Sequence, residues 1–215
     1  SAWCARTTAY VEVVNGDTIN IKSPWLENPT LVLHELYREY WPDDTVRALA
    51  ASAEIVSATN RRVAGRVESN QPLVFQDIRM FLNNTGRSAA FALYDSFGTC
   101  VGRLKILFDD TPTGNLKESI FPGTILTIAA KLPARNSADP VRVALASGQQ
   151  VITITDLQPG ENIKFNEGTL VLENLSVWAG FMFVRDYGKP VVWFGFVICI
   201  AGLTVHFSRR RSIFA

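Results

Sequence analysis

The chain has 215 residues, 47% of them hydrophobic, and a net charge of +1, so it can bury a core as one large domain or two small ones. Without Arg209, Arg210 and Arg211 the basic side chains fall from 21 to 18, against 20 acidic ones. No basic surplus is left to hold phosphates, and nucleic-acid binding is not expected.

The three cysteines are Cys4, Cys100 and Cys199. They form no CxxC or CxxCH motif, which argues against a zinc knuckle, a redox dithiol and a covalently attached c-type haem. Cys199 lies inside an apolar run, where we expect an inert thiol. The sequence leaves open whether Cys4 and Cys100 pair or stay free.

The N-terminal region predicts a hairpin followed by two short helices. Residues 9–24 alternate apolar and polar side chains around the Asn-Gly-Asp sequence at 15–17, which is typical of a β-hairpin. Residues 28–41 carry apolar side chains at helical spacing and stop before a proline. In residues 43–56 either of the two leading aspartates could cap a second helix, although a strand around 53–58 is the alternative. The apolar positions of the first predicted helix are Leu31, Leu33, Leu36, Tyr37, Tyr40 and Trp41.

Beyond residue 60 the helical signals fade. Short runs rich in β-branched and aromatic residues alternate with Gly, Asn, Asp and Pro, as in an antiparallel sandwich or open barrel. No repeat of fixed period and no low-complexity linker divides this region. The sequence therefore predicts a mainly β outer domain over residues 1–188, with short N-terminal helices and one C-terminal transmembrane helix.

The predicted transmembrane helix covers residues 189–208. Its run from 190 to 207 holds 18 residues without a formal charge if His206 is neutral, close to the roughly 20 needed to cross the hydrocarbon core. Gly195 and Gly202 are seven residues apart and so lie on one helix face. That face would favour close packing against a neighbouring helix, although GxxxG itself is absent.

Arg209, Arg210 and Arg211 set the expected topology. Arginines at the end of a span belong on the cytoplasmic side, which makes 209–215 a cytoplasmic tail and places residues 1–188 in the periplasm, anchored to the inner membrane. A buried core helix is the weaker alternative, because the run has two glycines and no polar face. The start "SAWCARTTAY" shows neither Met nor a signal peptide, so we expect the sequence to be the processed or visible remainder of a longer product.

The two histidines are His34 and His206. The stretch "HELYRE" lacks the second His of a zincin HExxH motif, so His34 is expected to be structural or to lie on the surface. His206 lies at the cytoplasmic end of the predicted span. It would either reach to the interface or serve as an axial ligand of a haem b that a partner carries or that binds between helices. A lone histidine leaves both readings open.

The carboxylates show no pattern that predicts a catalytic or metal site. Asp43-Asp44, Asp109-Asp110 and the pair Glu161 with Glu167 lack EF-hand spacing, and adjacent aspartates near Pro and Thr are more typical of turns. No GxSxG motif, Walker loop or dinucleotide fingerprint is present. The residues alone predict an anchored β domain without a catalytic site.

Two stretches resemble the ResB-like family, the outer-domain component of system II cytochrome c biogenesis. They are residues 66–86, "RVESNQPLVFQDIRMFLNNTG", and residues 178–214, "WAGFMFVRDYGKPVVWFGFVICIAGLTVHFSRRRSIF". The resemblance extends over residues 10–215 and departs from the family pattern at Tyr187, where the family commonly has Pro. The matching positions are Asn70, Pro72, Leu73 and Phe75, then Phe183, Asp186, Gly188, Gly195, Gly202, Leu203 and Arg209 to Arg211.

The resemblance implies a scaffold that works with a CcsA-type membrane protein to deliver haem to apocytochrome c. The chemistry would belong to the haem and to the client's cysteines. The family's haem-ligating histidines lie mainly in the partner and in an earlier membrane helix, so they cannot be placed on this chain. The alternative is a non-catalytic accessory subunit of a cytochrome-containing membrane complex, packed through Gly195 and Gly202. A sensor module would need a cytoplasmic output domain, and only four residues follow the arginines.

Overall fold

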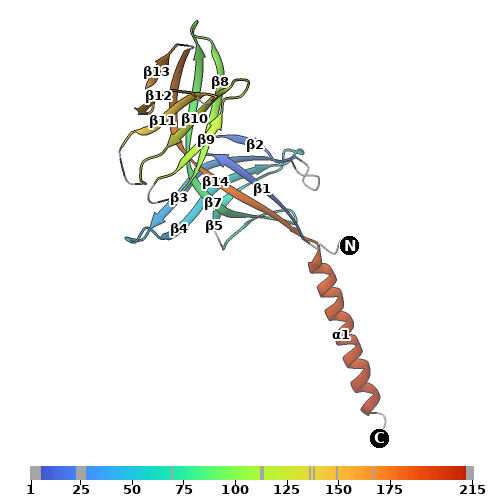
Figure 1. The fold of residues 1–215 in the computed structure, drawn as a ribbon. Coiled ribbons are helices and arrows are strands. Elements are labelled where there is room, and N and C mark those ends of the chain that lie inside the picture. Colours follow the sequence, from blue (N-terminus) through green and yellow to red (C-terminus); the bar gives the residue numbers. More distant parts are fainter. Residues whose placement is uncertain are drawn as a thin grey trace.

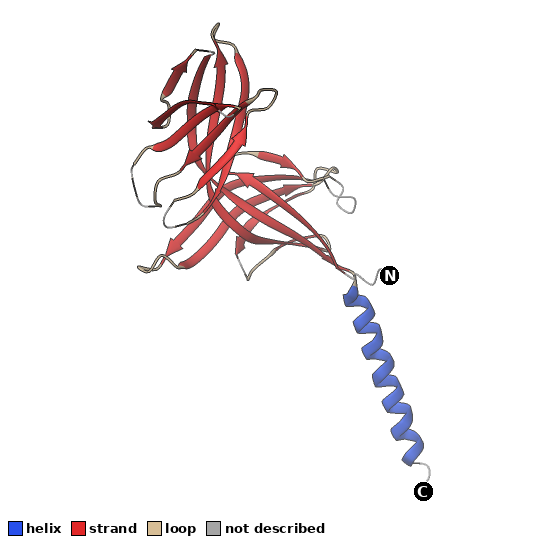
Figure 2. Ribbon diagram, in the orientation of Figure 1, coloured by secondary structure: helices blue, strands red, loops and turns tan. Residues whose placement is uncertain are grey.

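The computed structural model describes residues 6–22, 28–68, 70–111, 114–135, 137, 139–148, 150–166 and 168–211. The protein is mainly β, with antiparallel sheets and one C-terminal helix, which confirms the coarse prediction (Figure 2). Its elements are β1 (Arg6–Val14), β2 (Thr18–Asn20), β3 (Thr30–Tyr40), β4 (Val46–Val56), β5 (Arg62–Glu68), β6 (Leu73–Phe75), β7 (Ile78–Asp95), β8 (Cys100–Asp109), β9 (Leu116–Ile120), β10 (Leu126–Lys131), β11 (Val141–Ser147), β12 (Gln150–Leu157), β13 (Asn162–Phe165), β14 (Gly168–Asp186) and α1 (Gly188–Arg211).

The two longest strands, β7 and β14, form a central ribbon. They have 18 and 19 residues and pair antiparallel along their whole length, from Gly168 opposite Asp95 to Arg185 opposite Ile78. At about 3.3 Å per residue such strands extend roughly 60 Å. Figure 1 shows both strands running through the two parts of the β body. The ribbon therefore supplies two strands to each part.

The part nearer α1, here the proximal half, places one sheet against another. β1 pairs with β14 and β6 pairs with β7 on one side, and the sheet β2-β3-β4-β5 covers them. Burial of apolar area between the sheets is the main term that favours this packing. The core includes Leu31, Leu33, Ile55, Val67, Met80, Phe181 and Phe183.

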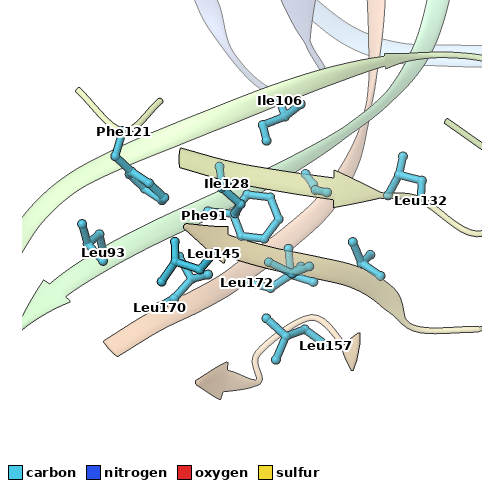
Figure 3. Packing of buried hydrophobic residues seen from close by; sticks show 14 of the residues in the cluster. Phe91, Leu93, Ile106, Phe121, Ile128, Leu132, Leu145, Leu157, Leu170 and Leu172 are labelled. Carbon is cyan, nitrogen blue, oxygen red and sulfur yellow. The ribbon is translucent and has the colours of Figure 1, made fainter. Parts of the chain in front are cut away.

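The distal half repeats the arrangement with the other ends of the ribbon. β13 pairs with β14 and β8 pairs with β7, and the sheet β12-β11-β10-β9 covers them. Figure 3 shows how the buried side chains from both sheets meet. The core includes Phe91, Phe108, Phe121, Ile128, Leu145, Leu170 and Leu172.

The two halves share one strand order. In the distal half β7 comes first in the chain and pairs with the strand after it, β8, while β14 comes last and pairs with the strand before it, β13. In the proximal half the two ribbon strands exchange roles: β14 pairs with β1, and β7 pairs with the strand before it, β6. This equivalence is topological, because the sequence shows no repeat of fixed period.

The prediction of two N-terminal helices was wrong. Residues 30–40 and 46–56 form strands β3 and β4, which pair antiparallel, so only the alternative strand around 53–58 was partly right. The pairing shifts between Leu33 and Glu35, which makes His34 an extra residue, a β-bulge. Because of the bulge the inward residues are Leu31, Leu33 and Leu36, which do not follow the strict alternation of a strand. This irregular spacing led to the prediction of a helix.

The predicted hairpin over residues 9–24, of which 23 and 24 lie outside the described residues, was also wrong in its pairing. A turn does form at 15–17: Gly16 has φ of 81°, and Asp17 N donates to Val14 O at 2.9 Å. However, β1 pairs with β14 and β2 pairs with β3. The turn therefore carries the chain from one sheet of the proximal half to the sheet that faces it.

Helix α1 extends away from the strands, as Figures 1 and 2 show. The backbone N–H of its first residue, Gly188, donates to Asp186 Oδ1 at 3.0 Å. Its apolar side chains are exposed, for example Val192 at 72% and Phe194 at 69%. Within the described residues, no helix reaches the combined length and apolarity that a bilayer crossing requires.

Candidate functional site

The two stretches that carry the family resemblance lie side by side. Residues 78–86 of the first stretch form the proximal part of β7, and residues 178–185 of the second form the part of β14 that pairs with it. The pairing begins with Gly86 opposite Trp178, the last residue of one stretch and the first of the other. Segments far apart in the sequence thus form one continuous surface of the proximal half.

Several of the matching residues have clear roles in the fold. Phe75 and Phe183 lie in the proximal core, exposed at 5% and 1%. Leu73 packs so closely on β5 that a β-carbon at Gly65 would lie 2.7 Å from its Cδ1. Asn70 lies in the tight turn between β5 and β6, where Glu68 and Gln71 exchange backbone hydrogen bonds of 3.0 and 3.2 Å.

The predicted site residues of the helix are all found in α1. His206 is exposed, with its ring edge-on to that of Phe207 at 5.6 Å between centroids. A β-carbon added at Gly195 or Gly202 would meet no atom within 4 Å, so both glycines face open space. Arg209, Arg210 and Arg211 form the last turn, but their side chains lie outside the described part of the structure.

The remaining sequence candidates lie apart from one another. Cys100 and Cys199 are free and exposed, while Cys4 and any pairing with it fall outside the described residues. His34 pairs with Glu54 at 3.3 Å on an exposed face of the proximal half. Among the described residues no three His, Cys, Asp or Glu side chains come together in a way that could hold a metal ion.

A cluster of charged side chains that the sequence did not predict lies where the two halves meet. We call Arg38, Tyr40, Arg87, Asp110 and Arg135 the junction cluster. The first two come from β3 in the proximal half and Arg87 from the middle of β7, while the last two come from the loops after β8 and β10 in the distal half. The cluster thus joins a proximal hairpin to distal loops.

Asp110 is the centre of the junction cluster. Its Oδ2 accepts hydrogen bonds from Arg38 Nη1 at 3.0 Å and from the Tyr40 hydroxyl, and its Oδ1 accepts from Arg135 Nε at 3.1 Å. The Asp110 side chain is only 8% exposed, against 16% for Arg38 and 11% for Arg135. Salt screens ion pairs with so little solvent exposure only weakly. Removing one partner leaves the other charge buried and uncompensated, which strongly destabilises the fold.

The aromatic ring of Tyr40 completes this contact between the halves. The guanidinium of Arg135 stacks over it, with its central carbon 3.6 Å from the ring centroid. Burial raises the pKa of the Tyr40 hydroxyl, and its hydrogen bond to Asp110 raises it further, whereas the nearby Arg38 lowers it. The hydroxyl therefore stays protonated and donates to the carboxylate.

Arg87 contributes a third guanidinium from the ribbon. Its Nη2 donates to the carbonyl oxygen of Pro133 at 2.6 Å. Burial lowers the pKa of Arg87; Asp110 opposes this shift, while the positive charges of Arg38 and Arg135 add to it. Arg87 Nε is buried and has no hydrogen-bond partner among the described residues.

The sequence interpretation of the carboxylates was right for one pair and incomplete for another. Asp43 is a turn residue: its Oδ1 accepts from Thr45 N at 3.1 Å and from Thr45 Oγ1 at 2.7 Å, which lowers the pKa of its carboxyl. Asp110 is no simple turn residue, because it anchors the junction. Its partners are 25 to 72 residues away, and no local spacing could have connected them.

In comparisons with known proteins, no family model, curated protein or solved structure matches the chain.

Proposed function

We propose that the chain is a membrane-anchored ResB-like protein of cytochrome c biogenesis. It would act as a scaffold that works with a CcsA-type membrane protein to deliver haem and attach it to apocytochrome c. The observation that carries the proposal is the pairing of the two resembling stretches along β7 and β14, which makes them one structural unit. Of the matching positions, Phe183 lies in this pairing, and Leu73 and Phe75 lie in β6, which pairs with β7. The others lie in the turn before β6, at the end of β14 and in α1.

In this proposal α1 is the membrane anchor. The run from residue 190 to 207 has no formal charge with His206 neutral, and the described apolar side chains of α1 are exposed rather than packed on the sheets. Exposed apolar surface of this extent is typical of an interaction site, and in this proposal the surface would contact the bilayer of the inner membrane. Arg209, Arg210 and Arg211 would keep the tail in the cytoplasm and the β body in the periplasm.

The β body would then hold partners at a distance from the bilayer. Its ribbon extends roughly 60 Å from the start of α1, at about 3.3 Å per residue. A body of this length would offer lateral surface for the partner and the client. The chemistry would reside in the haem and in the client's thiols.

The second candidate is an accessory subunit of a cytochrome-containing respiratory or electron-transfer complex. The open space around Gly195 and Gly202 on α1 favours it, because small residues let another helix approach closely. In this case the partners would be the helices of the host complex, and any haem b would be held at the interface.

A spectrum of the purified chain would separate the two candidates. The protein would be extracted in detergent, with and without copurifying partners, and a reduced-minus-oxidised visible spectrum recorded. The haem-delivery proposal predicts a haem b signal that the His206→Ala variant loses and the His34→Ala control keeps. Stoichiometric copurification with an intact oxidoreductase, without haem on this chain, would favour the accessory role.

Thiol labelling tests the topology in a Cys4→Ala background. Cys100 is exposed on the β body, so a membrane-impermeant maleimide should label it in cells whose outer membrane alone is permeabilised. Labelling of Cys100 only after the inner membrane is broken would contradict a periplasmic body. Release of the intact chain without detergent would contradict the anchor itself.

A further inference from the structure

We propose that the junction cluster binds a small oxyanion, the carboxylate or phosphate group of a ligand. This inference goes beyond the scaffold function and does not depend on it. It starts from charge: Arg38, Arg87 and Arg135 contribute three positive charges around the single buried carboxylate of Asp110. The net charge of the cluster is therefore +2, or +1 if the half-exposed Asp44 is counted. Asp44 Oδ1 lies 3.5 Å from Arg135 Nη1.

An uncompensated positive surplus is costly at this place. Asp110, Arg38 and Arg135 are each less than one-fifth exposed, so water screens their charges poorly. The lowered pKa of Arg87 has the same origin, since burial and the two neighbouring guanidiniums both disfavour its charged form. A bound anion would relieve this repulsion.

Two buried polar atoms are left without partners beside Asp110. Arg87 Nε and Thr111 Oγ1 make no hydrogen bond to any described residue. Thr111 follows Asp110 in the chain, and Arg87 is coupled electrostatically to Asp110. Buried donors without a partner are rare, and a bound oxyanion could accept hydrogen bonds from such groups. A guanidinium and a hydroxyl are groups that recognise carboxylate and phosphate oxygens.

A hollow of about 400 Å³ lies along the loop after β10, the loop that carries Arg135, and no residue of the junction cluster is among its lining residues. Pro133, whose carbonyl oxygen accepts from Arg87, lines this hollow, and so does Ala134, the neighbour of Arg135. The charged residues of the lining are Lys131, Arg142, Asp139 and Asp156.

The experiment measures binding of inorganic phosphate and of citrate to the full chain in detergent. Thermal unfolding is followed as each anion is added, with sodium chloride at equal ionic strength as the reference. We expect saturable stabilisation by at least one of the two anions, and the anion that acts distinguishes a phosphate ligand from a carboxylate ligand. Removing a charge that pairs with a buried ligand weakens binding by roughly tenfold or more.

The variants assign the effect to the junction. Arg87→Gln should abolish the saturable shift, whereas Arg66→Gln, which removes a 62% exposed arginine of β5, should keep it. Arg87→Lys retains the charge but lacks Nε, so it should stay folded and bind more weakly. Asp110→Asn enlarges the surplus and should tighten binding.

Three results would overturn the proposal. The first is stabilisation that follows ionic strength alone. The second is a saturable shift in the unfolding temperature that Arg87→Gln and Arg87→Lys leave unchanged. The third is weaker anion binding in a folded Asp110→Asn variant. Any of these would leave the cluster as a purely structural lock between the halves. Because the assay uses neither haem nor a partner protein, its failure would leave the scaffold proposal untouched.

Discussion

Trp178 lies opposite Gly86 in the central ribbon, and its indole fills the space that a side chain at position 86 would need. A β-carbon at Gly86 would lie 2.5 Å from Trp178 Nε1 and 1.9 Å from the carbonyl oxygen of Phe108. The indole N–H donates to that same carbonyl at 2.9 Å. At this level β14, β7 and β8 are fixed to one another where the two halves meet.

Gly86→Ala should therefore destabilise the protein. The β-carbon would collide with a backbone carbonyl, which cannot move without disturbing the pairing of β7 and β8, so we expect a loss of about 2–3 kcal/mol. Urea unfolding followed by tryptophan fluorescence measures it. Gly102→Ala in β8 is the matched control, because its nearest contact, at 3.6 Å, is ordinary. Equal stability of the two variants would show that the ribbon tolerates the collision.

Trp178→Phe should be destabilising for a different reason. Phenylalanine keeps most of the buried apolar surface but leaves the Phe108 carbonyl without its donor, a loss of about 1–3 kcal/mol. The control is Trp41→Phe, since Trp41 is half exposed. Guanidinium unfolding measures the loss of unfolding free energy in both variants. A smaller loss in Trp178→Phe than in Trp41→Phe would argue against the hydrogen bond as a stabilising contact.

Asp110→Asn should loosen the contact between the halves. The substitution leaves Arg38 and Arg135 buried without their carboxylate, for which we expect a loss of about 3 kcal/mol. Asp156→Asn breaks an exposed pair with Arg142 and should cost about 0–1 kcal/mol. Unfolding free energies at low anion concentration test both. Hydrogen exchange should increase in the β3–β4 hairpin and in the loop after β10, and unchanged protection there would contradict the role of Asp110.

Tyr40 should make stability depend on pH in the alkaline range. Its pKa is raised in the folded state, so the stability it contributes is complete below pH 10, its unfolded value, and is lost as pH rises through the folded pKa. The difference in unfolding free energy between wild type and Tyr40→Phe should therefore shrink above pH 10. Tyr37→Phe, at an exposed position, serves as the control. A difference that stays constant to pH 11.5 would refute the shift.

The β-rich character and the terminal helix could be predicted because their signals are local. Alternation, turn residues and an uncharged apolar run each lie within a few residues of one another. β3 was predicted as a helix because the bulge at His34 breaks the alternation of its inward residues. A bulge depends on the partner strand, here β4, and a single sequence shows no partner.

The long ribbon was hidden for a related reason. In β7 the inward residues have even numbers in the proximal half, such as Met80 and Leu82, and odd numbers in the distal half, such as Phe91. The register shift that leaves Asn83 as an extra residue accounts for the change. Asn and Gly lie around it, and these residues are more typical of the breaks between strands than of strand interiors. The pairing with β14 overrides this local preference.

The junction cluster could not be predicted at all. Arg38 and Asp110 are 72 residues apart, and Arg135 reaches Asp110 from another loop. Their meeting depends on how two separately packed halves are joined. Charged residues in loops are ordinarily solvated, so composition gave no reason to single these out.

Arg87 and Val177 are partners across the ribbon, and every strand segment of the distal half lies between them in the chain. The distal half is thus a single uninterrupted insert whose two ends emerge together, like a module spliced into a hairpin. If it were excised, a tight turn would be needed to rejoin residues 86 and 178. Such a shortened chain would keep α1, but Arg38 and Tyr40 would lose Asp110, and Trp178 would lose the Phe108 carbonyl.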